Sequence, residues 1–579
     1  MKKFITILLA LVMILAMCIP AFAEEAETTK VTITTSTSEN TKNRTYKAFK
    51  LLDLTVSHKD EGHGYNCPNK LDPSKPHTPD CYNYNYTISN QTYRTILQKE
   101  VKEHTDASFW TAQNVPVPTT ASAITDDLIL KYLETLIGDS GSNYSTLRKT
   151  ADRIYRDIQL ATDAPAGIDM KTNESKDLEQ GYWMIVETTS STDLGDYGAK
   201  SVVMLATNAR EEITVQPKDA LPVMEKKVKD IDDSEHTTTL DQPWQDSADH
   251  DIGDSIPFKL TATLPANMDS FNPYKLVFHD TMAAGLTLIP SSFKVYLYAN
   301  KVVADADNNM DNSVNLTTPV YEAPTTGGLT TYAETDLYKI DLAPTDGCTF
   351  EFTIKDANKI NGAVAGNAIV ITYQAQLAST AKLGSDGNSN SAYLEFSNDP
   401  YNATATGKTL NDTVKVFTYG LTINKEDAQG HALKGAGFTL YKFSAKATPE
   451  ATYVPVGEEL KGENMTQFNW IGLDDGDYRL VETTVPDGYN QMNPIEFTIL
   501  PVHSTTADTP ELTAINCVVM GNGVTSTGII TKAVVNHTGI ALPETGAEGT
   551  FFLIAGGTLL VLVAAVFMIT RKKMSVYED

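Results

Sequence analysis

Most of the chain consists of short runs in which apolar and polar residues alternate, which is the pattern of β-strands with one buried face. The runs are rich in Val, Ile, Thr, Tyr and Phe, and Gly, Asn, Asp or Pro residues bound them. Between 124 and 161 the apolar residues recur at helical spacing instead, and Thr125 can cap the first of two helices. The pattern predicts a mainly β chain of sandwich domains with one α+β domain. Clear strand runs are 31–35, 255–264, 350–354 and 368–376.

The sequence divides into five segments. The first, 1–23, has Lys2 and Lys3 before an apolar stretch and ends in Ala-Phe-Ala, which is typical of a signal peptide. We therefore expect an exported chain that begins at Glu24. The other predicted segments are an N-terminal α+β domain with a Cys/His insertion (24–216), a middle sandwich (217–416), a C-terminal sandwich (417–541) and an anchoring tail (542–579).

Charge and cysteine content narrow the functional classes. The formal net charge of −27 disfavours binding to nucleic acid and to anionic membranes. Five cysteines in 579 residues cannot make disulfides the main reinforcement of an exported chain. Cys67 and Cys81 share the insertion, where we expect a disulfide, and a zinc site formed with nearby histidines is the alternative. No cofactor is expected.

The C-terminal tail combines three features in a fixed order. A pentapeptide precedes an apolar run, 551–569, which is long enough to cross a bilayer and is followed by three basic residues. The pentapeptide is Leu542, Pro543, Glu544, Thr545 and Gly546. This order resembles the cell-wall sorting signal of Gram-positive surface proteins, and an ordinary membrane anchor is the simpler alternative. The resemblance implies that a sortase cleaves between Thr545 and Gly546 and transfers the Thr carbonyl to an amine.

The C-terminal sandwich is predicted to bury three polar groups. Leu421, Ile423 and Lys425 share one strand face, and the same alternation directs Glu482 and Asn536 inward. A buried lysine is costly unless it is paired or neutral. Burial lowers the pKa of a lysine and raises that of a glutamate, so a neutral amine can face a protonated carboxyl. Such an amine can attack the Asn carboxamide and release ammonia.

Three motifs surround these residues: Gly-Ala-Gly-Phe-Thr-Leu-Tyr at 435–441, Gly-Asp-Tyr-Arg-Leu-Val-Glu at 476–482 and Pro-Asp-Gly-Tyr at 486–489. They resemble the CnaB type of sandwich domain in sortase-assembled pilins. The resemblance implies an isopeptide bond from Lys425 to Asn536 with Glu482 as its catalyst. A surface lysine and a turn asparagine are the alternative interpretation.

The middle sandwich repeats this arrangement with different residues. Alternation along its first strand points Lys226 inward, and Asp280 and Asn398 are inward in their own strands. The runs 251–258 and 393–398 are similar to the CnaA-like middle domain of pilus backbone subunits. The resemblance implies tandem immunoglobulin-like sandwiches in which Lys226 attacks Asn398 with the help of Asp280. A turn-capping role is the alternative for Asp280.

The N-terminal domain resembles the first domain of the same pilins in 46–52 and 181–187. Glu187 stands where the last domain has its catalytic Glu. Lys30, however, is out of phase with its apolar neighbours, and no matching Asn is evident. We therefore predict no isopeptide bond in this domain.

A lysine at the first domain boundary is the candidate acceptor for the sorting reaction. Residues 213–218 resemble the pilin motif of backbone subunits, Val-x-Val-Tyr-Pro-Lys, with Gln216 in place of Tyr and without the usual preceding Trp. Pro217 cannot donate to a strand ladder and ends the strand, which leaves the next amine accessible. The resemblance implies that Lys218 accepts Thr545 of the neighbouring subunit.

These features predict a structural protein, the shaft subunit of a covalently polymerised surface pilus attached to the cell wall. The alternative is an LPETG-anchored monomeric adhesin. A secreted enzyme has little support, because Gly-Asp-Ser-Gly at 138–141 joins two helices and the acidic run 305–311 lacks the glycine of a calcium loop. The expected partners are a sortase, identical subunits, minor pilins, peptidoglycan and host surface ligands, with no nucleic acid.

Overall fold

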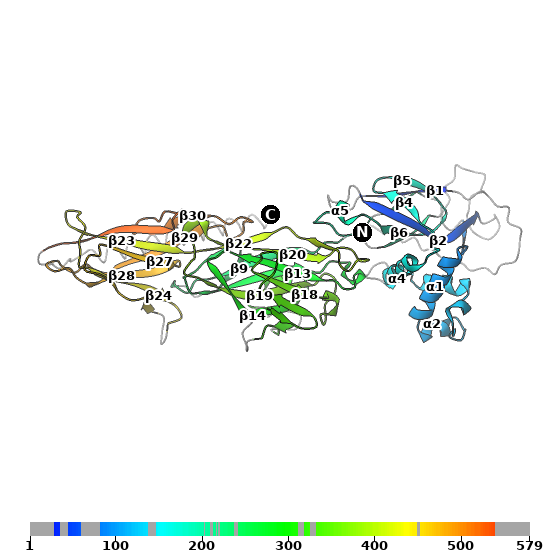
Figure 1. Cartoon of the computed structure of the whole chain (residues 1–579), viewed down its shortest axis with the longest axis horizontal. Coiled ribbons are helices and arrows are strands. Elements are labelled where there is room, and N and C mark those ends of the chain that lie inside the picture. Colours follow the sequence, from blue (N-terminus) through cyan, green and yellow to red (C-terminus); the bar gives the residue numbers. More distant parts are fainter. Residues whose placement is uncertain are drawn as a thin grey trace, which may run out of the picture.

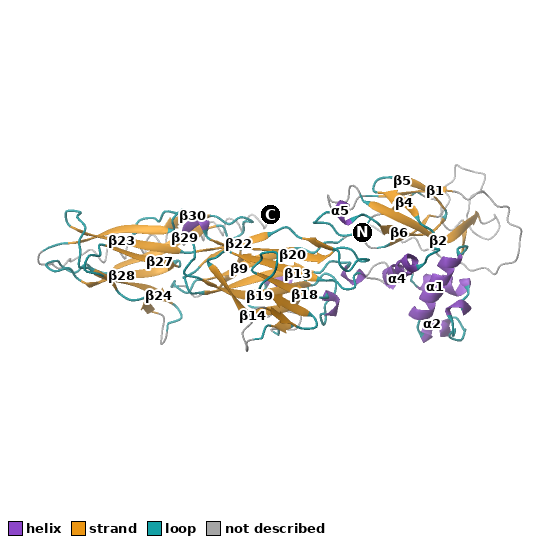
Figure 2. Ribbon diagram, viewed as in Figure 1, coloured by secondary structure: helices purple, strands orange, loops and turns teal. Residues whose placement is uncertain are grey.

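The fold is known from a computed structural model, which describes residues 28–34, 44–58, 82–136, 146–201, 203–208, 212–215, 217, 220–236, 241–310, 318–324, 332–447 and 452–538. These residues form three bodies that follow one another along the long axis of the molecule (Figure 1). Strands dominate two of the bodies, and the longer helices gather in the N-terminal one (Figure 2). The prediction of a mainly β chain is confirmed.

The N-terminal domain packs helices against a β-sheet. Helix α3 begins after Thr125, whose hydroxyl accepts from the Leu128 N–H at 3.4 Å, so the predicted cap is confirmed. The apolar faces of the helices, including Ile129 and Ile154, pack on strand residues such as Met184. The sheets run β3-β2-β6-β7, with β4 also paired to β2, and β5-β1-β8. The bounds are β1 Thr28–Ile33, β2 Thr45–His58, β3 Tyr82–Thr87, α1 Gln91–His104, α2 Ala107–Ala112, α3 Asp126–Thr135, α4 Thr146–Leu160, β4 Ile168–Lys171, β5 Ser175–Glu179, β6 Gly181–Glu187, α5 Ser191–Leu194, β7 Met204–Asn208 and β8 Ile213–Val215.

The middle domain is a sandwich of two sheets, ordered β10-β9-β12-β19-β14-β15 and β11-β22-β20-β13-β18-β17-β16, with β21 paired to β20. Leu260 and Ile371 from the first sheet and Phe278 and Leu394 from the second are fully buried in one core. The bounds are β9 Met224–Ile231, β10 Asp241–Gln245, β11 Ser247–Asp249, β12 Ser255–Thr263, β13 Leu276–Met282, β14 Leu286–Tyr298, α6 Lys301–Ala306, β15 Tyr321–Glu322, β16 Tyr332–Glu334, β17 Tyr338–Asp341, β18 Phe350–Ile354, β19 Ala368–Leu377, β20 Asn388–Ser397, β21 Thr406–Lys408 and β22 Asp412–Phe417.

The C-terminal domain is a smaller sandwich with sheets β27-β23-β31 and β25-β24-β28-β29-β30, and β26 pairs with β24. Its first strand, β23, lies parallel to its last strand, β31. Leu421, Phe438 and Leu480 fill the core between the sheets. The bounds are β23 Tyr419–Asp427, β24 Gly437–Ser444, β25 Thr452–Pro455, β26 Leu460–Lys461, β27 Gln467–Leu473, β28 Gly476–Thr484, β29 Ile495–His503, β30 Leu512–Asn516 and β31 Ile529–Asn536.

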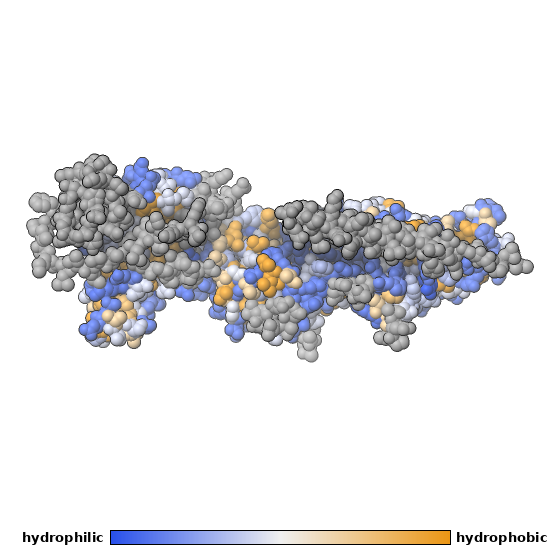
Figure 3. Space-filling model, turned by 180° about the vertical axis from the view of Figure 1, so that it is seen from behind, coloured by the Kyte–Doolittle hydropathy of each residue, from blue (hydrophilic) through white to orange (hydrophobic). Residues whose placement is uncertain are grey.

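Specific contacts join the domains. The rings of Tyr155 and Tyr401 meet edge to face at 4.6 Å between the first and second domains, and Lys200 pairs with Asp399. Between the second and third, the Ile252 N–H donates to the Gly472 carbonyl at 3.0 Å. Among the described residues that Figure 3 shows from behind, hydrophilic ones predominate, and apolar ones form smaller patches. Within the described part of the chain, no helix has the length and apolar character that a bilayer crossing needs.

Candidate crosslinking sites

The three polar residues expected inside the C-terminal domain lie together between its sheets. Lys425 is on β23, Asn536 on β31 and Glu482 on β28, and none is more than 1% exposed. Asn536 Nδ2 donates to Glu482 Oε1 at 2.7 Å. Lys425 pairs in register with Val534, two residues before Asn536, and its Nζ donates to the Val534 carbonyl at 3.2 Å. The amine, the carboxyl and the carboxamide are therefore all buried between the sheets, and the charge of Glu482 acts on the Lys425 amine.

The electrostatics of this cluster suit amide formation. Burial lowers the pKa of the Lys425 amine, and the nearby Glu482 carboxylate acts in the opposite direction. The Met492 N–H holds the second Glu482 oxygen, Oε2, at 3.0 Å, which fixes the carboxyl. Among the described residues, none hydrogen bonds to Asn536 Oδ1. A deprotonated Nζ can attack Asn536 Cγ while the carboxyl passes protons, so that ammonia leaves and an amide remains.

The middle domain holds a second buried cluster, in which Lys226 on β9 forms an ion pair with Asp280 on β13. The Tyr373 hydroxyl accepts from Lys226 Nζ at 2.6 Å and donates to Asp280 Oδ2 at 2.6 Å. Asn390 Nδ2 donates to the same hydroxyl at 3.0 Å. All four residues are at most 1% exposed. The Asp280 side chain therefore contacts the lysine and the tyrosine inside the core. A side chain that capped the following turn would not lie there.

Burial dominates the electrostatics of this second cluster as well. It lowers the pKa of the Lys226 amine and raises the pKa of the Asp280 carboxyl, and the attraction between the two groups opposes both changes. A proton moved from the amine to the carboxyl leaves both groups neutral, the state that a dry core favours. The neutral amine is then a nucleophile that the Tyr373 hydroxyl links to the Asn390 carboxamide.

Asn398 does not lie in this cluster, which corrects the expected attack of Lys226 on Asn398. Its Nδ2 donates to the Gly198 carbonyl at 3.1 Å, at the contact with the N-terminal domain. Asn390 and Asn398 have the same parity in one run, so both point inward, but eight residues of strand separate them by about 26 Å. Asp280 pairs in register with Ala392, so Asn390 is the asparagine beside it.

Two participants, Asn390 and Tyr373, were not identified from the sequence. Tyr373 alternates with Ile371 and Ala375 on the inner face of β19, and a hydroxyl at an inward position is the signal that would have identified it. Asn390 is likewise at an inward position of β20. To choose between Asn390 and Asn398, one must know how β20 pairs in register with β13.

In the N-terminal domain, Glu187 pairs with an arginine. Arg44 Nη1 lies 3.2 Å from Glu187 Oε2, and both side chains are buried. Hydroxyls of Thr189 and Ser201 donate to the same carboxylate at 2.7 and 2.8 Å. Lys30, the lysine considered from the sequence, is exposed. The arrangement gives Glu187 the partners of a structural carboxylate.

Replacing Arg44 with Met should destabilise the N-terminal domain by about 3–5 kcal/mol, because the change leaves a buried carboxylate without its cation. Chemical denaturation followed by tryptophan fluorescence would measure the loss. Lys30→Met is the matched control, and an exposed site should change stability by no more than about 0.5 kcal/mol. Equal effects of the two variants would contradict the structural role of the pair.

Several expected sites lie outside the described residues. They are the signal peptide, Cys67 and Cys81, Lys218, the pentapeptide Leu542 to Gly546, and the apolar run 551–569. Cys348 and Cys517 are described, and both are free thiols.

Comparisons with known proteins match two parts of this chain to families. Residues 420–512 match the family described as a prealbumin-like fold domain, SpaA, and residues 535–575 match the LPXTG cell wall anchor motif. The fimbrial subunit type 1 of Actinomyces viscosus is 29% identical over 141 residues, which are 24% of this chain and 22% of that protein.

Matches among solved structures include two pilins. The T6 backbone pilin of Streptococcus pyogenes is 14% identical, with 89% of this chain and 100% of that chain covered and a TM-score of 0.45. The major pilin SpaD of Corynebacterium diphtheriae is 13% identical, with 89% and 98% covered and a TM-score of 0.39.

Proposed function

We propose that this chain is the shaft subunit of a covalently polymerised pilus, which a sortase assembles and attaches to the cell wall. In this proposal, Thr545 of one subunit is joined to Lys218 of the next. The anchor match over 535–575 and the fimbrial relative support a surface-attached protein of this class. The protein then acts as a structural element, and the only chemistry of its own is the formation of internal bonds.

The observation that carries the proposal is the recurrence of one buried cluster in two successive domains. Each cluster contains a lysine, a carboxyl group and an asparagine. We infer isopeptide bonds between Lys226 and Asn390 and between Lys425 and Asn536, with Asp280 and Glu482 as the proton-transferring groups. Each bond forms as Nζ joins Cγ and ammonia departs, so no oxidant or cofactor is needed. Crosslinks of this kind suit a chain under tension, because covalent bonds hold when hydrogen bonds yield.

A cell-wall extract boiled in detergent provides the test of polymerisation. Antibody to this chain should detect a ladder of high-mass species, and deletion of the responsible sortase should remove the ladder. The expected partners of the polymer are the sortase, identical subunits and peptidoglycan, with minor pilins and host surface ligands as further candidates. A single monomer band from wild-type cells would contradict the proposal and favour the anchored monomeric adhesin.

A further inference from the structure

The loop that joins β17 to β18 brings a carboxylate and a thiol against the outer face of the middle domain. Asp346 and Cys348 belong to this loop, and His279 belongs to β13. Since Asp280 points into the core, the residue before it, His279, points to the outer face of the sheet. His279 is nevertheless only 7% exposed, because the loop and the Tyr393 ring lie against it. A histidine, a carboxylate and a thiol therefore meet at one place.

The three side chains have the spacing of ligands around one metal ion. One donor atom from each lies within 4.8 Å of the other two. Asp346 Oδ2 is 2.8 Å from His279 Nδ1 and 3.1 Å from Cys348 Sγ, and Sγ is 3.9 Å from Nδ1. Tetrahedral Zn²⁺, with bonds of about 2.0–2.3 Å, places its ligand atoms about 3.3–3.6 Å apart. Shifts of about half an ångström would therefore fit the three atoms around one ion.

Hydrogen bonds within the loop orient its two ligands. The Cys348 N–H donates to Asp346 Oδ1 at 3.0 Å, which leaves Oδ2 to face the histidine and the thiol. The next residue, Thr349, donates its N–H to the Asp280 carbonyl at 2.7 Å. The loop is thus held on β13 directly beside the histidine, and both loop ligands are aimed at it.

The His279 ring has one nitrogen inside the cluster and one outside. The ring stacks on Tyr393 with 4.4 Å between centroids and 6° between planes, which fixes its orientation. Nε2 is inaccessible to solvent, has no hydrogen-bond partner among the described residues, and lies 4.0 Å from Glu395 Oε2. A metal-binding histidine carries its proton on the nitrogen opposite the metal, where it usually faces a carboxylate. Metal at Nδ1 would place that proton on Nε2, on the side of Glu395.

Negative charge surrounds the imidazole. Besides Asp346, Glu351 Oε1 lies 3.6 Å from Nδ1, and Glu395 faces Nε2. Lys275 pairs with Glu395 at 3.6 Å and balances one of these charges. A cation at Nδ1 would balance the others, and an imidazolium proton or a metal ion could supply it. The thiol distinguishes these two, because sulfur is a weak hydrogen-bond partner and a strong metal ligand.

The thiol is not an activated nucleophile. Burial and the hydrogen bond to Asp346 raise the pKa of Cys348 to about 11, so the sulfur carries its proton at neutral pH. Reactive cysteines have a lowered pKa instead, which argues against a Cys-His catalytic pair. Zn²⁺ deprotonates the thiols that it binds, so one proton would pass from Sγ to solvent as the Zn–S bond forms.

We propose that His279 Nδ1, Asp346 Oδ2 and Cys348 Sγ bind one Zn²⁺ ion, with water in the fourth position. Nitrogen and sulfur donors select Zn²⁺ over Ca²⁺ and Mg²⁺, which prefer oxygen. The thiolate and the carboxylate together neutralise the ion. It would hold the β17–β18 loop on β13, the strand that carries Asp280 of the proposed crosslink. This inference rests on the outer face of one domain and is independent of polymerisation.

Zn²⁺ titration of the chain from Glu24 to Thr545, after removal of metals with EDTA, tests the proposal. Calorimetry should show one saturable equivalent of Zn²⁺, and an indicator dye should show release of a proton. Co²⁺ in place of Zn²⁺ should give the near-ultraviolet absorption of a cobalt–thiolate bond. Cys348→Ser should abolish this absorption and weaken the affinity for Zn²⁺ by at least about tenfold, since even the loss of an outer-shell partner costs about 10–100-fold.

Asp346→Asn is the second test variant, because its side chain is 34% exposed and the change should not disturb folding. It should also weaken Zn²⁺ binding, whereas Asp341→Asn, a change at the end of β17 outside the cluster, should not. Far-UV circular dichroism should show that the variants are folded.

The double variant Cys67→Ser with Cys81→Ser separates this site from a zinc site in the insertion of the N-terminal domain. It should keep the cobalt–thiolate absorption and the affinity for Zn²⁺. Loss of both in the double variant would overturn the proposal and place the zinc in the insertion. Absence of saturable Zn²⁺ binding, or unchanged binding by Cys348→Ser and Asp346→Asn, would overturn it as well.

Discussion

Intact-mass measurement of the recombinant chain from Glu24 to Thr545 is expected to give a value below that of its sequence by two molecules of ammonia. One is lost between Lys226 and Asn390, the other between Lys425 and Asn536. The reason is that each lysine lies buried beside a carboxyl and a carboxamide, at 0–1% exposure. Each bond closes a long loop and so lowers the conformational entropy of the unfolded chain. By analogy with a disulfide, each should therefore stabilise its domain by about 5 kcal/mol.

Two asparagines of one strand run provide a matched pair of variants for this measurement. Asn390→Ala should restore the mass of one ammonia, whereas Asn398→Ala should leave both losses in place, because the Asn398 side chain contacts the N-terminal domain instead. Glu482→Ala should block the second bond while Lys425 and Asn536 are both still present. A mass equal to that of the sequence would contradict both bonds, and restoration by Asn398→Ala would contradict the assignment in the middle domain.

Lys218→Ala is expected to abolish the high-mass ladder and leave a wall-attached monomer. The reason is that polymerisation needs an acceptor amine on each subunit, whereas wall attachment needs only the pentapeptide that ends in Thr545 and Gly546. Strand β8 ends at Val215 and β9 begins at Met224, so the lysine belongs to the connection between two domains. Immunoblots of wall extracts and of culture medium would measure both products.

Lys227→Ala is the control for this variant. Lys227 Nζ pairs with Asp246 at 2.6 Å and with Glu225 at 3.1 Å, so its amine is engaged in the folded domain. Burial acts to lower the pKa of Lys227, but the hydrogen bonds and charges of Asp246 and Glu225 raise it above its ordinary value. The raised pKa further reduces the fraction of neutral amine. Lys227→Ala should therefore keep the ladder. A ladder that persists in Lys218→Ala and disappears in Lys227→Ala would move the acceptor to Lys227.

Local alternation was sufficient to locate the C-terminal cluster but not the middle one. In the C-terminal domain, Asn536 is the last residue of the last strand, and its parity leaves no competing asparagine there. Strand β20 and the residue after it offer three buried asparagines, Asn388, Asn390 and Asn398. Only the register of β20 against β13 distinguishes them, and that register is set by contacts between residues distant in sequence.

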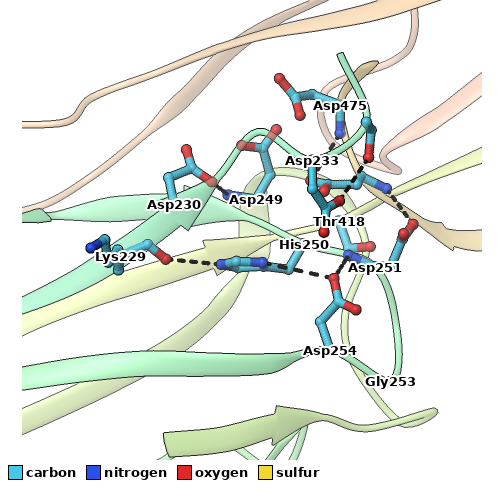
Figure 4. A network of polar contacts seen from close by, with 12 residues as sticks. Lys229, Asp230, Asp233, Asp249, His250, Asp251, Gly253, Asp254, Thr418 and Asp475 are labelled. Atoms are coloured by element: carbon cyan, nitrogen blue, oxygen red, sulfur yellow. Dashed lines mark hydrogen bonds and ion pairs between the residues drawn. The ribbon is translucent and has the colours of Figure 1, made fainter. Parts of the chain in front are cut away.

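The clustering of acidic residues at the junction between the middle and C-terminal domains (Figure 4) was not predicted from the sequence, because its members come from three separate segments. Asp230 and Asp249 look like ordinary polar residues at strand ends, and Asp474-Asp475 looks like a turn. Their meeting depends on how two domains dock, for example through the Ile252 N–H bond to the Gly472 carbonyl. Docking of this kind leaves no periodic signal in either domain.

The parallel pairing of β23 with β31 determines which residues would bear mechanical load. These strands open and close the C-terminal domain, and the proposed Lys425–Asn536 bond lies between them. A tensile force on the fibre would pass through that bond and would not load residues 426–535. In the middle domain, the bond from Lys226 would bypass 227–389 in the same way.

The fibre would then lengthen only through segments outside the two bonds, such as residues 391–424. A protein chain lengthens under force by about 3.3–3.6 Å for each residue pulled out of its fold, and the bypassed residues cannot be pulled out. The N-terminal domain precedes Lys218 and would therefore lie outside the load-bearing part of the chain. Contacts such as that of Tyr155 with Tyr401 would hold it against the middle domain. Proteolysis or sequence variation in that domain could therefore change the outer surface of the fibre without cutting it.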